Sequence, residues 1–346
     1  MKKALVVRLG AIGDMVIITP LLRALGEDGH SVTLYCRKGA DDIVRHNPFI
    51  KKVIFHDEKM TYDEFMAHVD KLGKEYDKFI NLTGSIEGSL LASEGTPEFD
   101  WPKYLRHSQF NVNYYDRTMM VGGYPEKKGL HGELFFSPAE EKQAREFRKK
   151  HKGKFIILWA LAGSSFHKAW PYAEQTAKAF LDKHPDAMTI TVGDELSVLL
   201  EWTHKQAKSY SGIWPVRKSL IMTKYADLVI GPDTGILNAA GCFDTQKILL
   251  LTGITPENIS KTWNNVNVVT ARNAECYPCH RLIHTLEACP IMPGINSPVC
   301  AANIPAGQVY LMIEEVYRKW REKRNGNAIS RDESNLCRRY NRALLG

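Results

Sequence analysis

The sequence lacks any apolar run long enough to cross a bilayer, which takes about 20 consecutive apolar residues. At the N-terminus, basic residues precede the apolar run Ala4-Leu5-Val6-Val7, but Arg8 ends that run at once. A signal peptide needs a longer apolar segment, so the run is interpreted as a first strand and the expected compartment is the cytoplasm.

Cysteines are too few for a disulfide framework, with seven in 346 residues. Cytoplasmic thiols also stay reduced. Cys276 and Cys279 have the spacing of half a zinc site, whereas Cys289 and Cys300 have ten residues between them, looser than the usual second half. Two interpretations stay open, a structural zinc at these four cysteines and free thiols that hold a loop, and the loose spacing favours the thiols. No other metal is expected.

The dinucleotide fingerprint G-x-G-x-x-G is also missing. Gly10 and Gly13 follow the first expected strand with a different spacing, and Tyr35-Cys36-Arg37 stands where an acidic residue would end the second strand. Because that acidic residue binds the ribose in such enzymes, the sequence argues against nicotinamide or flavin chemistry.

Charge is unevenly distributed along the chain. The formal net charge is +7, and residues 317–346 hold nine Lys or Arg against three acidic residues, so most of the basicity lies in the tail. A basic tail fits an anionic partner such as a lipid headgroup, a phosphorylated glycan or nucleic acid. The alternative is a solvated tail that aids solubility.

Short apolar runs alternate with helix-length segments in two successive units, which is typical of α/β domains with parallel sheets. The predicted architecture is two Rossmann-like domains, 1–150 and 151–306, followed by a helix and basic tail over 307–346. Pro20 should kink or displace the first helix. Residues 93–129 follow no regular pattern, and we expect such a stretch to line a binding surface. The expected strands are 5–7, 31–35, 52–55, 78–82, 155–158, 188–192, 228–230 and 247–251.

The turn Arg8-Leu9-Gly10-Ala11-Ile12-Gly13-Asp14 places a carboxylate at the carboxyl end of a strand. Asp14 would there face a cleft between two domains. It could equally cap the following helix, because Asp is favoured at helix starts. The spacing alone does not separate these two roles.

Two later turns combine small, hydroxyl and charged residues after a strand. The first contains Gly163, Ser164, Ser165 and Lys168, and small residues there let the backbone approach a phosphate while the lysine supplies a positive charge. A plain surface loop is the alternative. The second turn is Gly231-Pro232-Asp233-Thr234-Gly235. Its backbone amides could hold a diphosphate, and Asp233 could cap the helix or accept hydrogen bonds from a neutral sugar.

Together these three motifs resemble the heptosyltransferase family, glycosyltransferase family 9, in the segments R-L-G-A-I-G-D, G-S-S-x-x-K-x-W-P and G-P-D-T-G-x-x-x-A-A. Order and distances fit from residue 3 to about residue 320. The resemblance implies a GT-B fold, an inverting transfer without a required metal or cofactor, and an ADP-sugar donor. The 1–150 domain would bind the acceptor, the 151–306 domain the donor, and the last helix could pack back on the first domain.

Site residues carry over position by position. Asp14 matches the catalytic base, Lys168 the lysine at the donor phosphates and Glu195 the acid at the nucleoside. Asp233, Thr234 and Gly235 match the donor-binding D-T-G, next to Ser164, Ser165 and the turn glycines Gly10, Gly13 and Gly163. Asn238 departs from the family, which has His there. Because Asn carries no charge, this change puts a heptose donor in question.

The resemblance favours a lipopolysaccharide-core-like or other anionic glycan as acceptor, with the basic tail at the inner membrane face. Nucleic acid is the less favoured acceptor, suggested by the tail and the aromatic stretch from Trp101 to Tyr115. A third interpretation is a nucleotide-sugar-binding protein without activity. Retention of Asp14, Lys168 and Asp233 argues against it.

Overall fold

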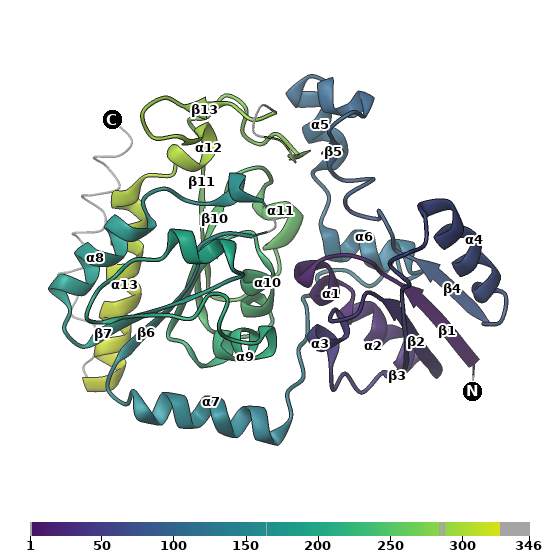
Figure 1. The fold of residues 1–346 in the computed structure, drawn as a ribbon, viewed down its shortest axis with the longest axis horizontal. Coiled ribbons are helices and arrows are strands. Elements are labelled where there is room, and N and C mark those ends of the chain that lie inside the picture. Colours follow the sequence, from purple (N-terminus) through teal and green to yellow (C-terminus); the bar gives the residue numbers. More distant parts are fainter. Residues whose placement is uncertain (1, 164, 284, 286–287, 326–346) are drawn as a thin grey trace.

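A computed structural model describes residues 2–163, 165–283, 285 and 288–325 and places them in two lobes, each built on a parallel sheet (Figure 1). The strand order is β3-β2-β1-β4 in the first sheet and β11-β10-β9-β6-β7-β8 in the second. The predicted pair of α/β units is therefore confirmed. The basic tail from residue 326 on lies outside the described residues, as does the role predicted for it.

Elements of the first lobe run to the long linker helix α7. In chain order they are β1 Lys2–Val7, α1 Ile12–Ile17, α2 Thr19–Glu27, β2 His30–Cys36, α3 Asp41–Val44, β3 Ile50–Phe55, α4 Tyr62–Gly73, β4 Lys78–Asn81, β5 Ala92–Ser93, η1 Pro97–Asp100, α5 Lys103–Phe110, α6 Tyr114–Val121 and α7 Pro138–Lys150.

Elements of the second lobe follow α7. They are β6 Phe155–Ala160, η2 Phe166–Lys168, α8 Ala173–Lys183, β7 Ala187–Val192, η3 Leu196–Leu200, β8 Ala207–Ser209, α9 Val216–Tyr225, β9 Leu228–Pro232, α10 Gly235–Gly241, β10 Gln246–Leu251, α11 Pro256–Ile259, β11 Val266–Thr270, β12 Arg281–Leu282, β13 Ile291–Met292, β14 Ser297–Pro298, α12 Val299–Ala302 and α13 Ala306–Asn325.

Alternating side chains of β1 pack on opposite faces of the first sheet, as the period of a strand requires. Leu5 and Val7 contact the side of α4, whereas Ala4 and Val6 join the core under α1 and α2. In the second lobe every residue of β6 is buried, which fits a central parallel strand covered on both faces.

One expectation about helices is confirmed and two need correction. Pro20 displaces a helix start as predicted, because it lies in the first turn of α2 and begins a new helix after α1. The stretch 93–129 contains α5 and α6, so it is not irregular throughout. The last helix, α13, packs on α8 and β10 of the second lobe, with Val309 and Ile313 in that core, and not on the first lobe. Its apolar face explains this, because Val309 and Ile313 share one core with residues of α8 and β6.

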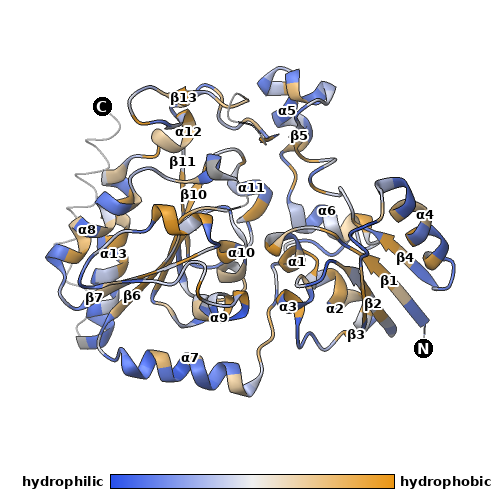
Figure 2. Ribbon diagram, in the orientation of Figure 1, coloured by the Kyte–Doolittle hydropathy of each residue, from blue (hydrophilic) through white to orange (hydrophobic). Residues whose placement is uncertain are grey.

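The two lobes are joined by more than the chain crossover. Helix α7 runs along the foot of the second lobe, packs on α9 there and is largely hydrophilic (Figure 2). At the other end, β5 pairs with β12 across the lobes, and the Arg106 side chain donates to the carbonyl of Cys279 at 2.7 Å. One apolar core cluster also continues from beneath α1 and α2 to beneath α9 and α10. Both ends of the region between the lobes are therefore held.

Arg217 on α9 fixes the linker helix to both lobes. Its guanidinium donates to the carbonyls of Asp42 (2.6 Å) and Phe135 (2.9 Å) and pairs with Glu140, whose side chain also accepts from the Ser137 amide at the start of α7. The arginine side chain is 7% exposed. The hydrogen bond from Arg217 lowers the pKa of Glu140 from 4.5 to about 2.

This ion pair makes the free energy of unfolding depend on pH in the acidic range. Because the folded pKa of Glu140 lies below its unfolded value, the pair stabilises the fold above pH 4.5, and this contribution is lost as the pH falls toward 2. Arg217→Met should lower the unfolding free energy at neutral pH by about 3 kcal/mol, since it leaves a carboxylate without its partner. Denaturant unfolding at several pH values measures both effects.

The control variant is Lys178→Met, which removes an exposed pair with Glu174 within α8. Such pairs contribute well under about 1 kcal/mol. Equal stability losses in the two variants would contradict the role given to Arg217.

Candidate active site

Arg8 and two carboxylates form a buried ion cluster where β1 ends. The guanidinium of Arg8 lies 2.6 Å from Asp14 Oδ1, pairs with both oxygens of Glu87 (3.0 and 2.9 Å) and donates to the carbonyl of Leu82 at 2.7 Å. Arg8 is 1% exposed, so its charge is screened little by water. The cluster holds Asp14 in one orientation.

Asp14 also takes part in starting α1, which supports the capping role in part. Its Oδ2 accepts from the Ala11 amide at 2.7 Å, and Ala11, not Asp14, is the N-cap residue. A Cβ on Gly10 would lie 2.5 Å from Asp14 Oδ2, so only glycine leaves room for this carboxylate. The Asp14 side chain keeps 18% exposure and reaches the cleft described below.

Burial raises the pKa of Asp14 above its ordinary value, and the charge of Glu87 raises it further. The Arg8 charge and the Ala11 amide act in the opposite direction without cancelling the rise. A carboxylate with a raised pKa is a better proton acceptor when it is ionised. The site therefore holds a group suited to general base work.

Across from Asp14, the second lobe contributes a lysine, an acid and an amide. Lys168 Nζ donates to the backbone carbonyl of Asp233 at 3.0 Å and lies 3.3 Å from its carboxylate. The Asn238 amide donates to Asp233 Oδ1 (3.3 Å) and to the carbonyl of Thr234 (2.9 Å), and its own oxygen is buried with no partner among the described residues. Thr234 is the N-cap of α10, which leaves Asp233 free of that role.

Close contacts at glycines bring the two sets of residues together. A Cβ on Gly13 would lie 3.1 Å from the Asn238 amide nitrogen, and one on Gly235 would lie 2.4 Å from Ile12 Cγ2. Gly163 similarly lies against the Thr234 methyl group. The turn after β1 thus packs on the turn after β9, and α1 faces α10 at the middle of Figure 1.

A cavity of about 520 Å³, called the cleft here, lies between the lobes along this contact. Most of the residues chosen from the sequence line it. They are Gly13, Asp14, Gly163, Ser165, Lys168, Asp233, Thr234, Gly235 and Asn238. The cleft is of the size that small-molecule ligands occupy.

Two chosen residues lie elsewhere. Glu195 is exposed and does not line the cleft, whereas its neighbour Asp194 does. Gly10 lines a second cavity, described below. Ser164 lies outside the described residues. The donor-binding role of Glu195 stays a prediction.

Sequence reasoning gave no role to Arg8 or Glu87, both of which the structure places at the site. For Arg8 a signal exists, since a charged residue directly after an apolar strand is costly unless it is paired. For Glu87, which lines the cleft, we find none, because the chain reaches the site there through a loop. Tyr114 also lines the cleft, and it belongs to the stretch 93–129 that was expected to line a binding surface.

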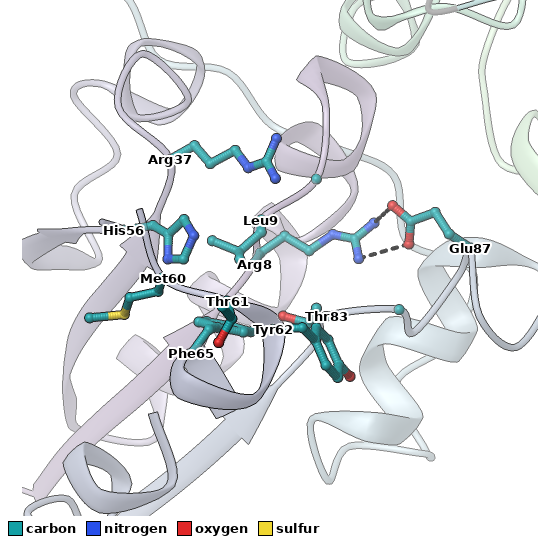
Figure 3. A pocket seen from close by; sticks show the side chains of 12 residues that line it. Arg8, Leu9, Arg37, His56, Met60, Thr61, Tyr62, Phe65, Thr83 and Glu87 are labelled. Carbon is teal, nitrogen blue, oxygen red and sulfur yellow. Dashed lines mark hydrogen bonds and ion pairs between the residues drawn. The ribbon is translucent and has the colours of Figure 1, made fainter. Parts of the chain in front are cut away.

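A second cavity of about 330 Å³, called the side pocket here, opens in the first lobe (Figure 3). Arg8, Gly10 and Glu87 line it together with residues that follow β2, β3 and β4. Glu87 lines both the side pocket and the cleft, and the two cavities therefore adjoin at the Arg8–Glu87 pair.

Three of the four cysteines considered for zinc line the cleft. They are Cys279, Cys289 and Cys300; burial raises the pKa of Cys289 to about 11, and none is in a disulfide. Among the described residues no group of three or more His, Cys, Asp or Glu is arranged to hold a metal ion. Zinc at Cys276, Cys279, Cys289 and Cys300 is thus an untested prediction, which metal analysis of the purified protein decides.

Comparison with protein-family models gives no match for this chain, and comparison with curated protein sequences gives none. Solved structures do resemble it. The glycosyl transferase family 9 protein from Veillonella parvula DSM 2008 has a TM-score of 0.65 at 16% identity, covering 92% of this chain and 97% of that one. E. coli ADP-heptose LPS heptosyltransferase II has a TM-score of 0.64 at 13% identity, covering 92% and 99%.

A third similar structure is the iron-containing dodecameric glycosyltransferase TibC from enterotoxigenic E. coli H10407. Its TM-score is 0.60 at 13% identity, over 92% of this chain and 77% of that one. The similarity to all three spans both lobes. The fold is GT-B. At these identities the likeness concerns the GT-B fold alone, and the chemistry rests on the residues described above.

The contact between α1 and α10 gives a test of the closed arrangement. Gly235→Ala would place a methyl group 2.4 Å from Ile12 Cγ2, and we expect it to cost about 1–3 kcal/mol of stability because the packed turns must separate. Thermal unfolding measures the loss, and small-angle scattering measures any opening of the lobes.

The matched control is Gly307→Ala in α13, where an added Cβ meets nothing within 4 Å. Alanine is favoured over glycine in a helix, so this variant should unfold no more easily than the parent. A Gly235→Ala variant that behaves like this control would contradict the close packing at the cleft.

Proposed function

We propose that this protein is an inverting glycosyltransferase that moves a sugar from an ADP-sugar donor to an acceptor hydroxyl. One observation carries the proposal. A buried carboxylate with a raised pKa, Asp14, and a lysine–acid–amide group, Lys168, Asp233 and Asn238, line one cleft from opposite lobes. Transfer between two substrates needs such an arrangement, with a base for one and charge stabilisation for the other.

Asp14 acts in this proposal as the general base. The acceptor oxygen attacks the anomeric carbon while the bond from that carbon to the diphosphate breaks, and the acceptor proton passes to Asp14. Its Oδ1 is held by Arg8 and its Oδ2 by the Ala11 amide, which fixes the carboxylate in place before substrate arrives. Base catalysis of this kind contributes about 10²–10⁴-fold.

Lys168 would neutralise the charge that develops on the leaving diphosphate. It is 32% exposed, and its two hydrogen bonds to Asp233 leave one N–H of the ammonium group to donate. Asp233 and the Asn238 amide would then contact the sugar hydroxyls, because a carboxylate beside a diphosphate would be repelled. The ADP part is proposed because one of the similar structures is an ADP-heptose heptosyltransferase. The neutral Asn238 leaves the sugar itself open to test.

The proposed acceptor is an anionic glycan or glycolipid. Nucleic acid is less well supported, since of the aromatic residues from Trp101 to Tyr115 only Tyr114 lines the cleft, and Trp101 stacks on Phe110. Within the part of the chain that the structure describes, no helix has the length and hydropathy of a membrane span. Peripheral attachment through the tail stays a prediction from the sequence.

We further propose that the transfer step requires no metal ion, because Lys168 can supply the positive charge that the leaving group needs. TibC is iron-containing, so a metal with a structural role in this chain is a separate question. Metal analysis and a chelator-treated assay answer the two questions independently.

The base role predicts a specific effect of Asp14→Asn. Transfer should fall by about 10²–10⁴-fold because the amide cannot accept the proton, while ADP binding stays near that of the parent. Release of ADP from ADP-glucose and ADP-heptose measures turnover, and calorimetry measures ADP binding. Asp70→Asn on the exposed face of α4 is the control and should match the parent. If the Asp14→Asn variant turns over as fast as the parent, Asp14 is not the base and contributes only to the start of α1.

Glu87 should set the pH range of activity. Its charge raises the pKa of Asp14, so Glu87→Gln should shift the acid limb of the pH–rate profile to lower pH, because Asp14 then ionises more readily. The control is Glu75→Gln, an exposed residue after α4. If the acid limb of the Glu87→Gln profile stays in place or moves to higher pH, Glu87 does not raise the pKa of Asp14.

A further inference from the structure

Tyr114 is a cleft residue to which the proposed mechanism gives no role. It is the first residue of α6 in the first lobe and is 4% exposed. Its hydroxyl is buried and has no hydrogen-bond partner among the described residues. A buried tyrosine hydroxyl usually has a partner, because burial removes its hydrogen bonds to water. A phenol left unpaired at the wall of a cavity is suited to bind a ligand.

The Tyr114 hydroxyl lies among the carboxylates of the cleft. Burial raises the pKa of Tyr114 well above its ordinary value, and the charges of Asp233, Asp14 and Glu87 raise it further. All three carboxylates line the cleft, and Asp233 has the largest effect of the three. Tyr114 therefore stays protonated at neutral pH, so its O–H can donate a hydrogen bond but the residue cannot act as a base.

The backbone just before Tyr114 is tied to the second lobe. Four hydrogen bonds join residues 110–113 to α11 and to the N-cap residue of that helix. The side chain of Asn258 on α11, which is 0% exposed, donates two of them, to carbonyls of this segment at 2.8 and 3.0 Å. Residues 252–254, which precede α11, line the cleft. Tyr114 thus belongs to the first lobe, but its position is fixed relative to the second.

These observations assign the Tyr114 hydroxyl to the donor sugar. Asp233 and the Asn238 amide are the groups proposed above to contact the sugar hydroxyls, and Asp233 is the carboxylate that acts most strongly on Tyr114. A sugar hydroxyl can accept a hydrogen bond from the phenol and donate one to a carboxylate at the same time. A site of this kind discriminates against a sugar that lacks the hydroxyl, because the buried phenol then stays unpaired.

We propose that Tyr114 is a specificity-determining residue, which donates a hydrogen bond from the first lobe to one hydroxyl oxygen of the transferred sugar. The proposal rests on the glycosyltransferase function above and adds to it a group that distinguishes donor sugars. It also gives a function to the contact between residues 110–113 and α11, since that contact holds the phenol beside the donor side of the cleft.

The test compares Tyr114→Phe with Tyr115→Phe, which removes the same atom from the next residue, a buried side chain that does not line the cleft. ADP-glucose, ADP-mannose and ADP-heptose are the probes, and calorimetry measures the dissociation constants of ADP and of each ADP-sugar. We expect Tyr114→Phe to weaken the preferred ADP-sugar about three- to tenfold, as the loss of one neutral hydrogen bond does, and to leave ADP binding unchanged. Tyr115→Phe should change neither constant.

Monodeoxy analogues of the preferred ADP-sugar, each lacking one sugar hydroxyl, identify the contact. One analogue should bind the parent about three- to tenfold more weakly than the complete sugar, and it should lose nothing further in Tyr114→Phe because its partner is already gone. Tyr114→Phe should also unfold at the temperature of the parent, since it loses no hydrogen bond to a described residue. A purely structural role for the hydroxyl predicts the opposite, lower stability and unchanged discrimination.

The proposal is overturned if every analogue carries the same penalty in Tyr114→Phe as in the parent. The analogues also test the parent alone, which covers the case in which Tyr114→Phe does not fold: if none binds the parent more weakly than the complete sugar, Tyr114 does not read the sugar. ADP binding separates this failure from that of the proposed function. A parent that binds ADP without discriminating the analogues contradicts only the role of Tyr114, whereas a parent that binds neither ADP nor any ADP-sugar contradicts the proposed function and this proposal with it.

Discussion

The pairing of Arg8 with Asp14 and Glu87 is the interaction on which the rest of the site depends. A guanidinium that is 1% exposed would be costly without partners, and here two carboxylates and the Leu82 carbonyl satisfy it. The same contacts orient Asp14 and form the partition between the cleft and the side pocket. Asp14 thus owes its position to the arginine at the end of β1, whereas its raised pKa comes from burial and from the charge of Glu87.

Close backbone approach gives the second constraint. The cleft forms where Gly13 packs against the Asn238 side chain and Gly235 against the Ile12 side chain, at positions where a Cβ would lie 3.1 and 2.4 Å from these neighbours. Arg217 and the pairing of β5 with β12 hold the lobes at the two ends of this contact. Residues more than 200 positions apart in the sequence therefore meet with little freedom, which is what a reaction between two bound substrates requires.

The sequence alone was sufficient to predict those parts of the fold and of the site that a local residue pattern determines. Apolar runs and glycine turns predicted both sheets, and most of the site residues predicted from the sequence line the cleft, including Asp14 and Lys168. Long-range pairings such as that of Arg217 with Glu140 leave no local pattern, and neither does the side pocket, which is assembled from the ends of four separate strands. For the same reason the packing of α13 on the second lobe could not be predicted from its own periodicity, which shows an apolar face but not its partner.

The most direct test of the central claim is donor cleavage without acceptor. The protein is incubated with ADP-, GDP-, UDP- and CDP-linked sugars, and the release of each nucleoside diphosphate is measured by chromatography. Slow release from ADP-sugars, absent in the Asp14→Asn variant, is the predicted result, because water can replace the acceptor at the base. If the folded protein neither binds nor cleaves any of these donors, the cleft is not a donor site and the account is wrong.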